Sequence, residues 1–214
     1  FTDLGNVNMR RKLVAGNWKM NGSKASIKEL LDGIKQGMAD VSDADVCVCA
    51  PFVYLGEVES QLNGTTVAWG SQNISEQASG AYTGEISASM LNDFKCSYVI
   101  IGHSERRTLY GEDDALVAKK FAAVRAAGMV PVLCIGETLD ERESGVTEEV
   151  VARQIDAVID AEGIGAIGDA VIAYEPVWAI GTGKTATPEQ AQEVHDFIRK
   201  RLAGHDATVA EKTR

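Results

Sequence analysis

The sequence predicts an α/β fold built on a parallel β-sheet. Six short apolar runs alternate along the chain with longer segments that carry apolar residues at helical spacing. Within each run the apolar residues are almost continuous, which is typical of parallel strands covered on both faces. Parallel neighbours need long crossover connections, and the segments between the runs have the length and pattern to supply them as helices.

The six predicted strands set the architecture. They cover residues 12–17, 45–50, 65–70, 97–102, 130–135 and 170–174. A series of strand-helix units closes either as an open doubly wound sheet or as an eightfold barrel. No G-x-G-x-x-G motif follows the first strand, and the GTGK segment at 181–184 lacks the spacing of a P-loop. The doubly wound, dinucleotide-binding fold therefore lacks the glycine motif with which it binds phosphate. The barrel is also not complete, since six strand-helix units do not by themselves close an eight-unit barrel.

Helical periodicity and end signals define the segments between the strands. Thr187 is placed as an N-cap, Pro188 occupies the first helical position, and Gly128 is a helix stop. The predicted helices cover residues 23–40, 53–62, 86–92, 113–127, 147–161 and 187–202. We expect residues 205–214 to form one helical turn or to lead into a further strand.

The charge balance excludes some classes of partner. The chain has 21 Lys and Arg against 31 Asp and Glu, a net charge of −10, with 45% hydrophobic residues. Such a chain repels phosphate backbones and anionic lipid, so we expect neither a nucleic-acid nor a membrane partner. An anionic small substrate stays compatible, because local fields can oppose the net charge. No apolar run approaches the roughly 18 residues of a membrane span, and no signal peptide is visible.

The four cysteines favour a reducing compartment. Cys47 and Cys49 share one face of a predicted strand, and Cys96 and Cys134 stand alone, without a C-x-x-C or Cys/His ligand pattern. We expect all four to be reduced and mostly buried, and the protein to be cytoplasmic.

Polar residues gather where the predicted strands end. Lys19 follows the first strand, His103 the fourth and Glu175 the sixth, while Gln72 and Glu137 follow the third and fifth. In a parallel α/β sheet the carboxyl ends of the strands share one rim, where ligands bind. A cation, an imidazole and a carboxylate that converge there suit proton transfer beside an anion or a carbonyl.

Each of these residues also has a structural interpretation. Lys19 is compatible with a solvated surface lysine and His103 with a hydrogen-bonded structural histidine. Glu175, directly before Pro176 at the end of a buried strand, is harder to explain without a function.

Three longer segments resemble the triosephosphate isomerase family. They are GNWKMN at 16–21, IGHSERR at 101–107 and AYEPVWAIGTGK at 173–184, in the family's order and at the expected strand ends. SQN at 71–73 and YTGE at 82–85 are similar to the family's third loop, and the resemblance runs from Met9 to Arg214. It implies a TIM (β/α)8 barrel, of which this chain carries the first six units.

The resemblance also implies a reaction: the interconversion of dihydroxyacetone phosphate and glyceraldehyde 3-phosphate in glycolysis and gluconeogenesis. Glu175 resembles the base that moves a proton between two carbons, and His103 the electrophile at the substrate oxygens. Lys19 resembles the cation that holds the substrate and the developing negative charge. Only protons move, so no metal or organic cofactor is expected.

Further residues of the family pattern have supporting roles. Asn17 resembles a polar contact to the substrate, and Gly181 a backbone donor to its phosphate within a mobile lid at 177–184. Glu105 resembles the carboxylate that orients Lys19, and we expect Ser104 to be a further supporting residue of the site. We also expect a homodimer through the loop 72–85, in which Ile74 and Tyr82 are apolar and unlikely to stand alone in solvent.

The chain departs from the family pattern in its extent. We interpret residues 1–8 as an expression remnant or extension and 9–214 as a single β/α barrel domain that is C-terminally incomplete. The phosphate loops that the family places after strands seven and eight are not in this sequence. The chain is then a fragment of a larger enzyme, or is completed by a second chain, or is an inactive scaffold. The alternative function is a catalytically inactive partial barrel that must assemble with a complementary chain.

Overall fold

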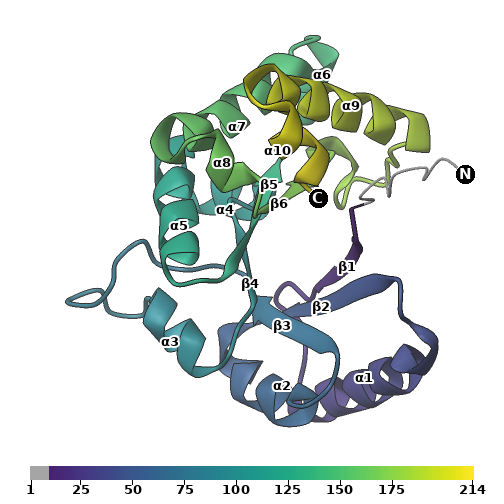
Figure 1. Cartoon of the computed structure of the whole chain (residues 1–214), viewed down its shortest axis with the longest axis vertical. Helices are drawn as coiled ribbons and strands as arrows, with labels where there is room; N and C mark the ends of the chain where they lie inside the picture. The colour runs from purple at the N-terminus through teal and green to yellow at the C-terminus, as the bar shows by residue number, and fades with distance from the viewer. Residues whose placement is uncertain (1–9) are drawn as a thin grey trace, which may run out of the picture.

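Six parallel strands, hydrogen-bonded in the order in which they occur along the chain, form one curved sheet with helices on its outer side (Figure 1). This computed structural model describes residues 10–214. The strands are β1 (Lys12–Asn17), β2 (Ala44–Ala50), β3 (Val67–Ser71), β4 (Tyr98–Ile101), β5 (Val130–Ile135) and β6 (Val171–Tyr174). A doubly wound sheet reverses its strand order, whereas this sheet never does, so the expectation of a six-unit part of a TIM barrel is confirmed. The segment 1–8, interpreted above as a remnant or extension, lies outside the described residues.

Every predicted helix is present, with ends shifted by a few residues. They are α1 (Lys24–Gly37), α2 (Leu55–Leu62), α3 (Ala88–Asp93), α5 (Asp114–Ala126), α7 (Thr147–Glu162) and α9 (Pro188–His205). Three short 3-10 segments, η1 (Met38–Asp40), η2 (Phe52–Tyr54) and η3 (Val177–Ala179), flank them. The side chain of Thr187 accepts from the backbone of Gln190, whose side chain accepts from Thr187 in return. The capping box thus fixes the start of α9 as predicted.

Three helices were not predicted from the sequence, and a fourth, α10 (Ala207–Lys212), lies where one helical turn was among the expectations. The three are α4 (Ser104–Tyr110), α6 (Leu139–Glu143) and α8 (Ile164–Ile167). Each is too short for an apolar period to show. The end of the chain combines both expectations for residues 205–214, because α10 is followed by Arg214, whose carbonyl accepts from the backbone N–H of Ile172 in β6 at 2.9 Å.

The hydrophobic core has two parts, one on each face of the sheet. The larger part lies between the sheet and the outer helices and includes Leu31, Val58, Phe121 and Val151. The smaller lies on the concave face and consists of Cys47, Cys49, Tyr98, Ile100, Val132, Cys134 and Val171. All four cysteines are free and buried, as expected.

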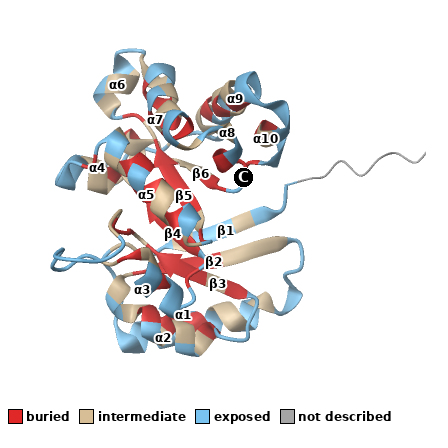
Figure 2. Ribbon diagram, turned by 60° about the vertical axis from the view of Figure 1, so that its left-hand side comes forward, coloured by how far each residue is buried: buried red, intermediate tan, exposed pale blue. Residues whose placement is uncertain are grey.

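Burial on both faces, expected for all strands, is wrong for β1. Most of β1 is exposed, and Val14 keeps 60% of its surface accessible, whereas β4 and β5 are almost wholly buried (Figure 2). Within residues 10–214 strand β1 has one neighbour, β2, so one side of it has no covering strand.

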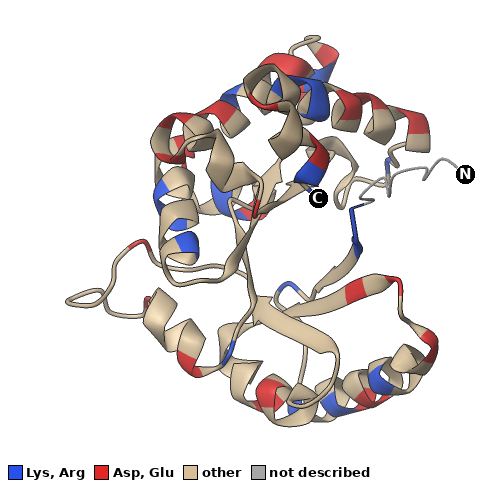
Figure 3. Cartoon of the chain, in the orientation of Figure 1, with Lys and Arg blue, Asp and Glu red and all other residues tan. Residues whose placement is uncertain are grey.

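Charged residues lie mainly on the outer helices, and the strands carry few of them (Figure 3). Among the described helices, none is both long and apolar enough to cross a lipid bilayer.

The loop between β3 and α3 projects from the body of the molecule (Figure 1). Residues 78–85 are exposed at its tip, and its base is closed by a hydrogen bond from Ser75 N to Ile86 O at 2.8 Å. Ile74 is fully buried in the chain's own core, so it needs no partner subunit to cover it, and this part of the argument for a dimer is wrong. Tyr82 is 46% exposed, and for Tyr82 the expectation of a covering partner stays a prediction.

Candidate active site

His103 sits where β4 turns into α4. Gly102 before it adopts a φ of +65°, a left-handed conformation that glycine tolerates and that turns the chain out of the sheet. The backbone N–H of Glu105 donates to Nδ1 of His103 at 3.2 Å, so this nitrogen carries no proton. The imidazole proton is then on Nε2, which lies 2.9 Å from Oε2 of Glu175. His103 is thereby arranged as a neutral donor.

Glu175 follows β6, and its side chain is only 11% exposed. Its carboxylate accepts from the backbone N–H of Ser104 at 3.1 Å and from the Ser104 hydroxyl at 2.8 Å. Burial acts to raise the pKa of Glu175, but the hydrogen bonds from His103 and Ser104 outweigh it and hold that pKa below its ordinary value. The carboxylate is therefore ionised at neutral pH and can act as a base.

Lys19 lies just beyond β1 in a strained conformation. Its φ of +52° is unusual for a residue with a side chain, and such strain is typical of functional sites. The Asn17 side chain accepts from the backbone N–H of Lys19 at 3.0 Å, and Gln72 Nε2 donates to the backbone carbonyl of Lys19 at 2.9 Å. These two contacts fix the backbone of Lys19. At the other end of the side chain, Nζ of Lys19 lies 2.7 Å from Oε1 of Glu105.

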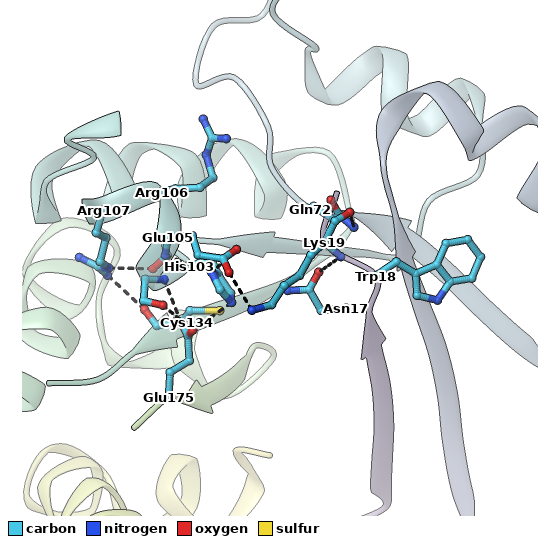
Figure 4. A network of polar contacts seen from close by, with 12 residues as sticks. Asn17, Trp18, Lys19, Gln72, His103, Glu105, Arg106, Arg107, Cys134 and Glu175 are labelled. Carbon is cyan, nitrogen blue, oxygen red and sulfur yellow. Dashed lines mark hydrogen bonds and ion pairs between the residues drawn. The ribbon is translucent and has the colours of Figure 1, made fainter. Parts of the chain in front are cut away.

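The predicted residues of β1, β4 and β6 form one connected group (Figure 4). Glu105 joins its two sides, because its carboxylate contacts Nζ of Lys19 and its backbone N–H donates to Nδ1 of His103. An open cleft of about 540 Å³ lies against this group. Its polar lining includes Asn17, Lys19, Asn21, Gln72, His103 and Glu105, and its apolar lining includes Met20, Phe52, Leu109 and Tyr110. The cleft places an ammonium group and an imidazole within one solvent-accessible space.

Gly181 is not brought to the cleft. It is exposed, beyond η3, and is not among the residues that line the cleft. Its φ of +66° belongs to a turn in which the Thr182 hydroxyl donates to the carbonyl of Trp178 at 2.6 Å. The expected contact between Gly181 and a phosphate therefore needs a movement of this segment.

Sequence reasoning placed Glu137 on the rim but gave it no role. Its side chain is wholly buried and accepts from Trp178 Nε1 at 2.9 Å, Tyr174 OH at 2.9 Å and Arg142 Nη1 at 3.0 Å. Glu137 thus anchors the root of the segment that carries Gly181. Its position directly after a strand was the available signal, but its partners lie up to 41 residues away.

A buried ion-pair network lies behind the cleft. Arg106 Nε contacts Oε2 of Glu112 at 2.6 Å, and Lys120 Nζ contacts Oε1 of Glu112 and Oδ1 of Asn73, each at 2.8 Å. Lys120 and Glu112 are only 4% and 3% exposed. The neighbouring residues Glu105 and Arg106 thus form ion pairs with different partners, Glu105 with Lys19 and Arg106 with Glu112.

The comparisons with known proteins agree with this geometry. A family model described as triosephosphate isomerase matches residues 12–214. A triosephosphate isomerase of Thiobacillus denitrificans is 63% identical over 94% of this chain and 80% of its own length. Those of Nitrosomonas eutropha and Dechloromonas aromatica are 57% and 58% identical over 94% and 96% of the chain, and 80% and 82% of their own lengths. These similarities support the enzymatic interpretation and not the inactive scaffold.

Proposed function

The chain belongs to the triosephosphate isomerase family, and from this premise we propose that Lys19, His103 and Glu175 interconvert dihydroxyacetone phosphate and glyceraldehyde 3-phosphate. The observation that carries the assignment is the contact of 2.9 Å between Nε2 of His103 and Oε2 of Glu175, with Lys19 on the same rim. A base, a neutral hydrogen-bond donor and a cation are the groups that enolisation of a carbonyl compound needs.

The first step is removal of a proton from the carbon beside the carbonyl group. The Glu175 carboxylate accepts this proton, and the C–H electron pair forms the C=C bond of an enediolate as the carbonyl π electrons move to oxygen. A proton then passes from the hydroxyl group on this carbon to the former carbonyl oxygen. The same carboxylate returns its proton to the former carbonyl carbon as the C=C electron pair forms the new C–H bond and the second oxygen becomes the new carbonyl. One carbon is oxidised and the other reduced, so there is no net redox change. In the present arrangement the carboxylate accepts two hydrogen bonds from Ser104. It must exchange them for contact with the substrate before it can act.

Negative charge develops on the substrate oxygen during that step. Lys19 supplies the compensating charge, because its ammonium group uses one of three donors on Glu105 and has others for the substrate. His103 donates from Nε2, the nitrogen that carries its proton in this arrangement. Fixed donors of this kind stabilise a transition state strongly, because they need no reorientation when the charge forms.

Asn17, Glu105 and Gly181 complete the assignment. Asn17 and Glu105 hold the backbone and the ammonium group of Lys19, and Asn17 also presents its amide to the cleft. Gly181 donates its backbone N–H to the substrate phosphate when the segment 177–184 closes. Closure excludes water and protects the enediolate, and the buried anchor at Glu137 keeps the root of the segment fixed while its tip moves.

A homodimer through the loop 72–85 is the second part of the proposal. The exposed tip at 78–85 with Tyr82 supplies a projecting segment, and the cleft supplies exposed apolar side chains: Met20 at 95%, Leu109 at 69% and Tyr110 at 67%. Exposed apolar surface of this kind is typical of an interaction site. We place the protein in the cytoplasm, in glycolysis and gluconeogenesis, since four free buried cysteines suit a reducing compartment.

A coupled assay of triose phosphate isomerisation tests the active site. Glu175→Gln, His103→Gln and Lys19→Met should each lower kcat/KM by at least about a hundredfold, because each removes a group that acts in the transition state. His205→Gln, at the exposed end of α9, should leave it unchanged. Full activity in the Glu175→Gln variant would show that the base is assigned wrongly.

A further inference from the structure

Arg107 of α4 joins three separate elements behind the active site. Its Nε donates to the carbonyl of Gly102 at 2.7 Å, its Nη2 to the carbonyl of Cys134 at 3.2 Å, and its Nη1 to Oδ1 of Asp114 at 2.7 Å. The side chain is 15% exposed, so these bonds form largely away from water. Figure 4 shows the guanidinium group on the opposite side of His103 from Lys19.

The two carbonyl groups lie where the ladder between β4 and β5 stops. The last paired residues are Ile101 and Leu133, so Gly102 and Cys134 are the next positions in register. Gly102 has turned out of the sheet with its φ of +65° and leaves the ladder there. The guanidinium group bridges the carbonyls of these two residues and so extends the connection between the strands by one step beyond the ladder.

Both bridged residues are adjacent to the reacting groups. The Gly102 carbonyl belongs to the peptide bond that leads into His103. Cys134 precedes Ile135, whose carbonyl accepts from the backbone N–H of Glu175 at 2.7 Å. The spacing between the backbones of His103 and Glu175 is therefore set partly by the separation of the two strand ends that Arg107 connects.

Resting on the function proposed above, we propose that Arg107 is a positioning residue for proton transfer, which fixes the separation of the strand ends that carry His103 and Glu175. Arginine suits the task because its planar fork reaches two carbonyls and a carboxylate at once, which the single ammonium group of lysine cannot do in the same geometry. The fit is tight, since a Cβ atom on Gly102 would lie 2.9 Å from Nη2 of Arg107.

The test uses Arg107→Lys, which keeps the positive charge and loses the fork. We expect kcat to fall by about 10–100-fold with KM changed less than about threefold, because a misplacement near 1 Å slows chemistry and Arg107 does not line the substrate cleft. We also expect a larger isotope effect on kcat with substrate deuterated at the carbon that loses its proton. A partly unfolded sample would lower kcat without changing this isotope effect, because its folded fraction works normally.

Two further variants separate positioning from stability. Arg153→Lys is the matched control. Arg153 also contacts Asp114, at 2.9 Å, but its side chain is 60% exposed and, within residues 10–214, forms no hydrogen bond to the strand ends. This variant should keep both kcat and the isotope effect. Arg107→Gln, whose amide can reach one carbonyl, gives a second measurement with the same expected direction if Arg107→Lys does not fold. If the parent is active and its Arg107 variants keep the same kcat and isotope effect, the inference about Arg107 is wrong and the proposed function stands. If the parent is inactive, the proposed function is wrong, and the inference about Arg107 fails with it.

Discussion

Nε2 of His103 lies 2.9 Å from Oε2 of Glu175, although the two residues follow β4 and β6, which are not neighbours in the sheet. Strand β5 lies between them, and strands two apart in a flat sheet are separated by roughly 9–10 Å. The two side chains span that distance by reaching inward across the end of β5 on the curved sheet. The geometry of the acid-base pair thus depends on how three strands end, and not on either residue alone.

Shortening the base should slow the reaction without weakening substrate binding. Glu175→Asp withdraws the carboxylate by roughly 1 Å, and a misplacement of that size costs on the order of a hundredfold in rate. Steady-state kinetics should show this loss in kcat with a similar KM. Glu189→Asp, in the exposed first turn of α9, is the control. A kcat within twofold of the parent, together with a raised KM, would contradict the assignment of the base.

Removing the Ser104 hydroxyl should shift the pH dependence. Its hydrogen bond at 2.8 Å is one of the contacts that lower the pKa of Glu175, so Ser104→Ala raises that pKa. The base acts when ionised, and activity is lost as the pH falls through this pKa. The acidic limb of the kcat/KM profile should therefore move to higher pH in the variant. Ser144→Ala, at an exposed serine after α6, should leave the limb in place, and an unmoved limb in both variants would contradict the prediction.

The buried ion pair of Lys120 and Glu112 should be important for stability. Lys120→Met leaves the side-chain oxygen of Asn73 without this donor and removes one of the two cations on Glu112, of which Arg106 remains, so we expect a loss of about 1–3 kcal/mol. Urea denaturation should show this decrease in the free energy of unfolding. Lys28→Met removes an exposed pair with Asp32 and should produce no measurable change. Equal losses in the two variants would show that burial does not govern the effect.

Charge at the tip of the projecting loop should separate the proposed dimer. Tyr82→Asp places a carboxylate on a side chain that is 46% exposed and that we assign to the interface. Light scattering at micromolar concentration should give the mass of a dimer for the parent and of a monomer for the variant. Leu30→Asp, at 47% exposure on α1, is the matched control and should remain dimeric. A monomeric parent with full activity would contradict the dimer.

The sequence alone predicted the order and type of the main elements. β1 and β5 have the predicted bounds, and α1, α5 and α9 begin directly after Ser23, Asp113 and Thr187, whose side chains cap them. These signals are local, because an apolar period and a capping side chain act within a few residues of themselves. The positions of Lys19, His103 and Glu175 at strand ends were predicted for the same reason.

The tertiary structure alone decided which side chains meet. The contact of Lys19 with Glu105, across 86 residues, was implied only by the family resemblance. Lys120 reaches Asn73 across 47 residues, and Trp178 reaches Glu137 across 41, distances over which no local pattern extends. The same holds for the burial of Ile74, the exposure of β1 and the bridge that Arg107 makes between two strand ends. Helix α4 also belongs here, since a helix of seven residues has little intrinsic stability and is held by the cap of His103 and by the partners of Arg106 and Arg107. Local sequence preferences thus determined which segments form helices and strands, whereas the curvature of the sheet decided which distant side chains come into contact.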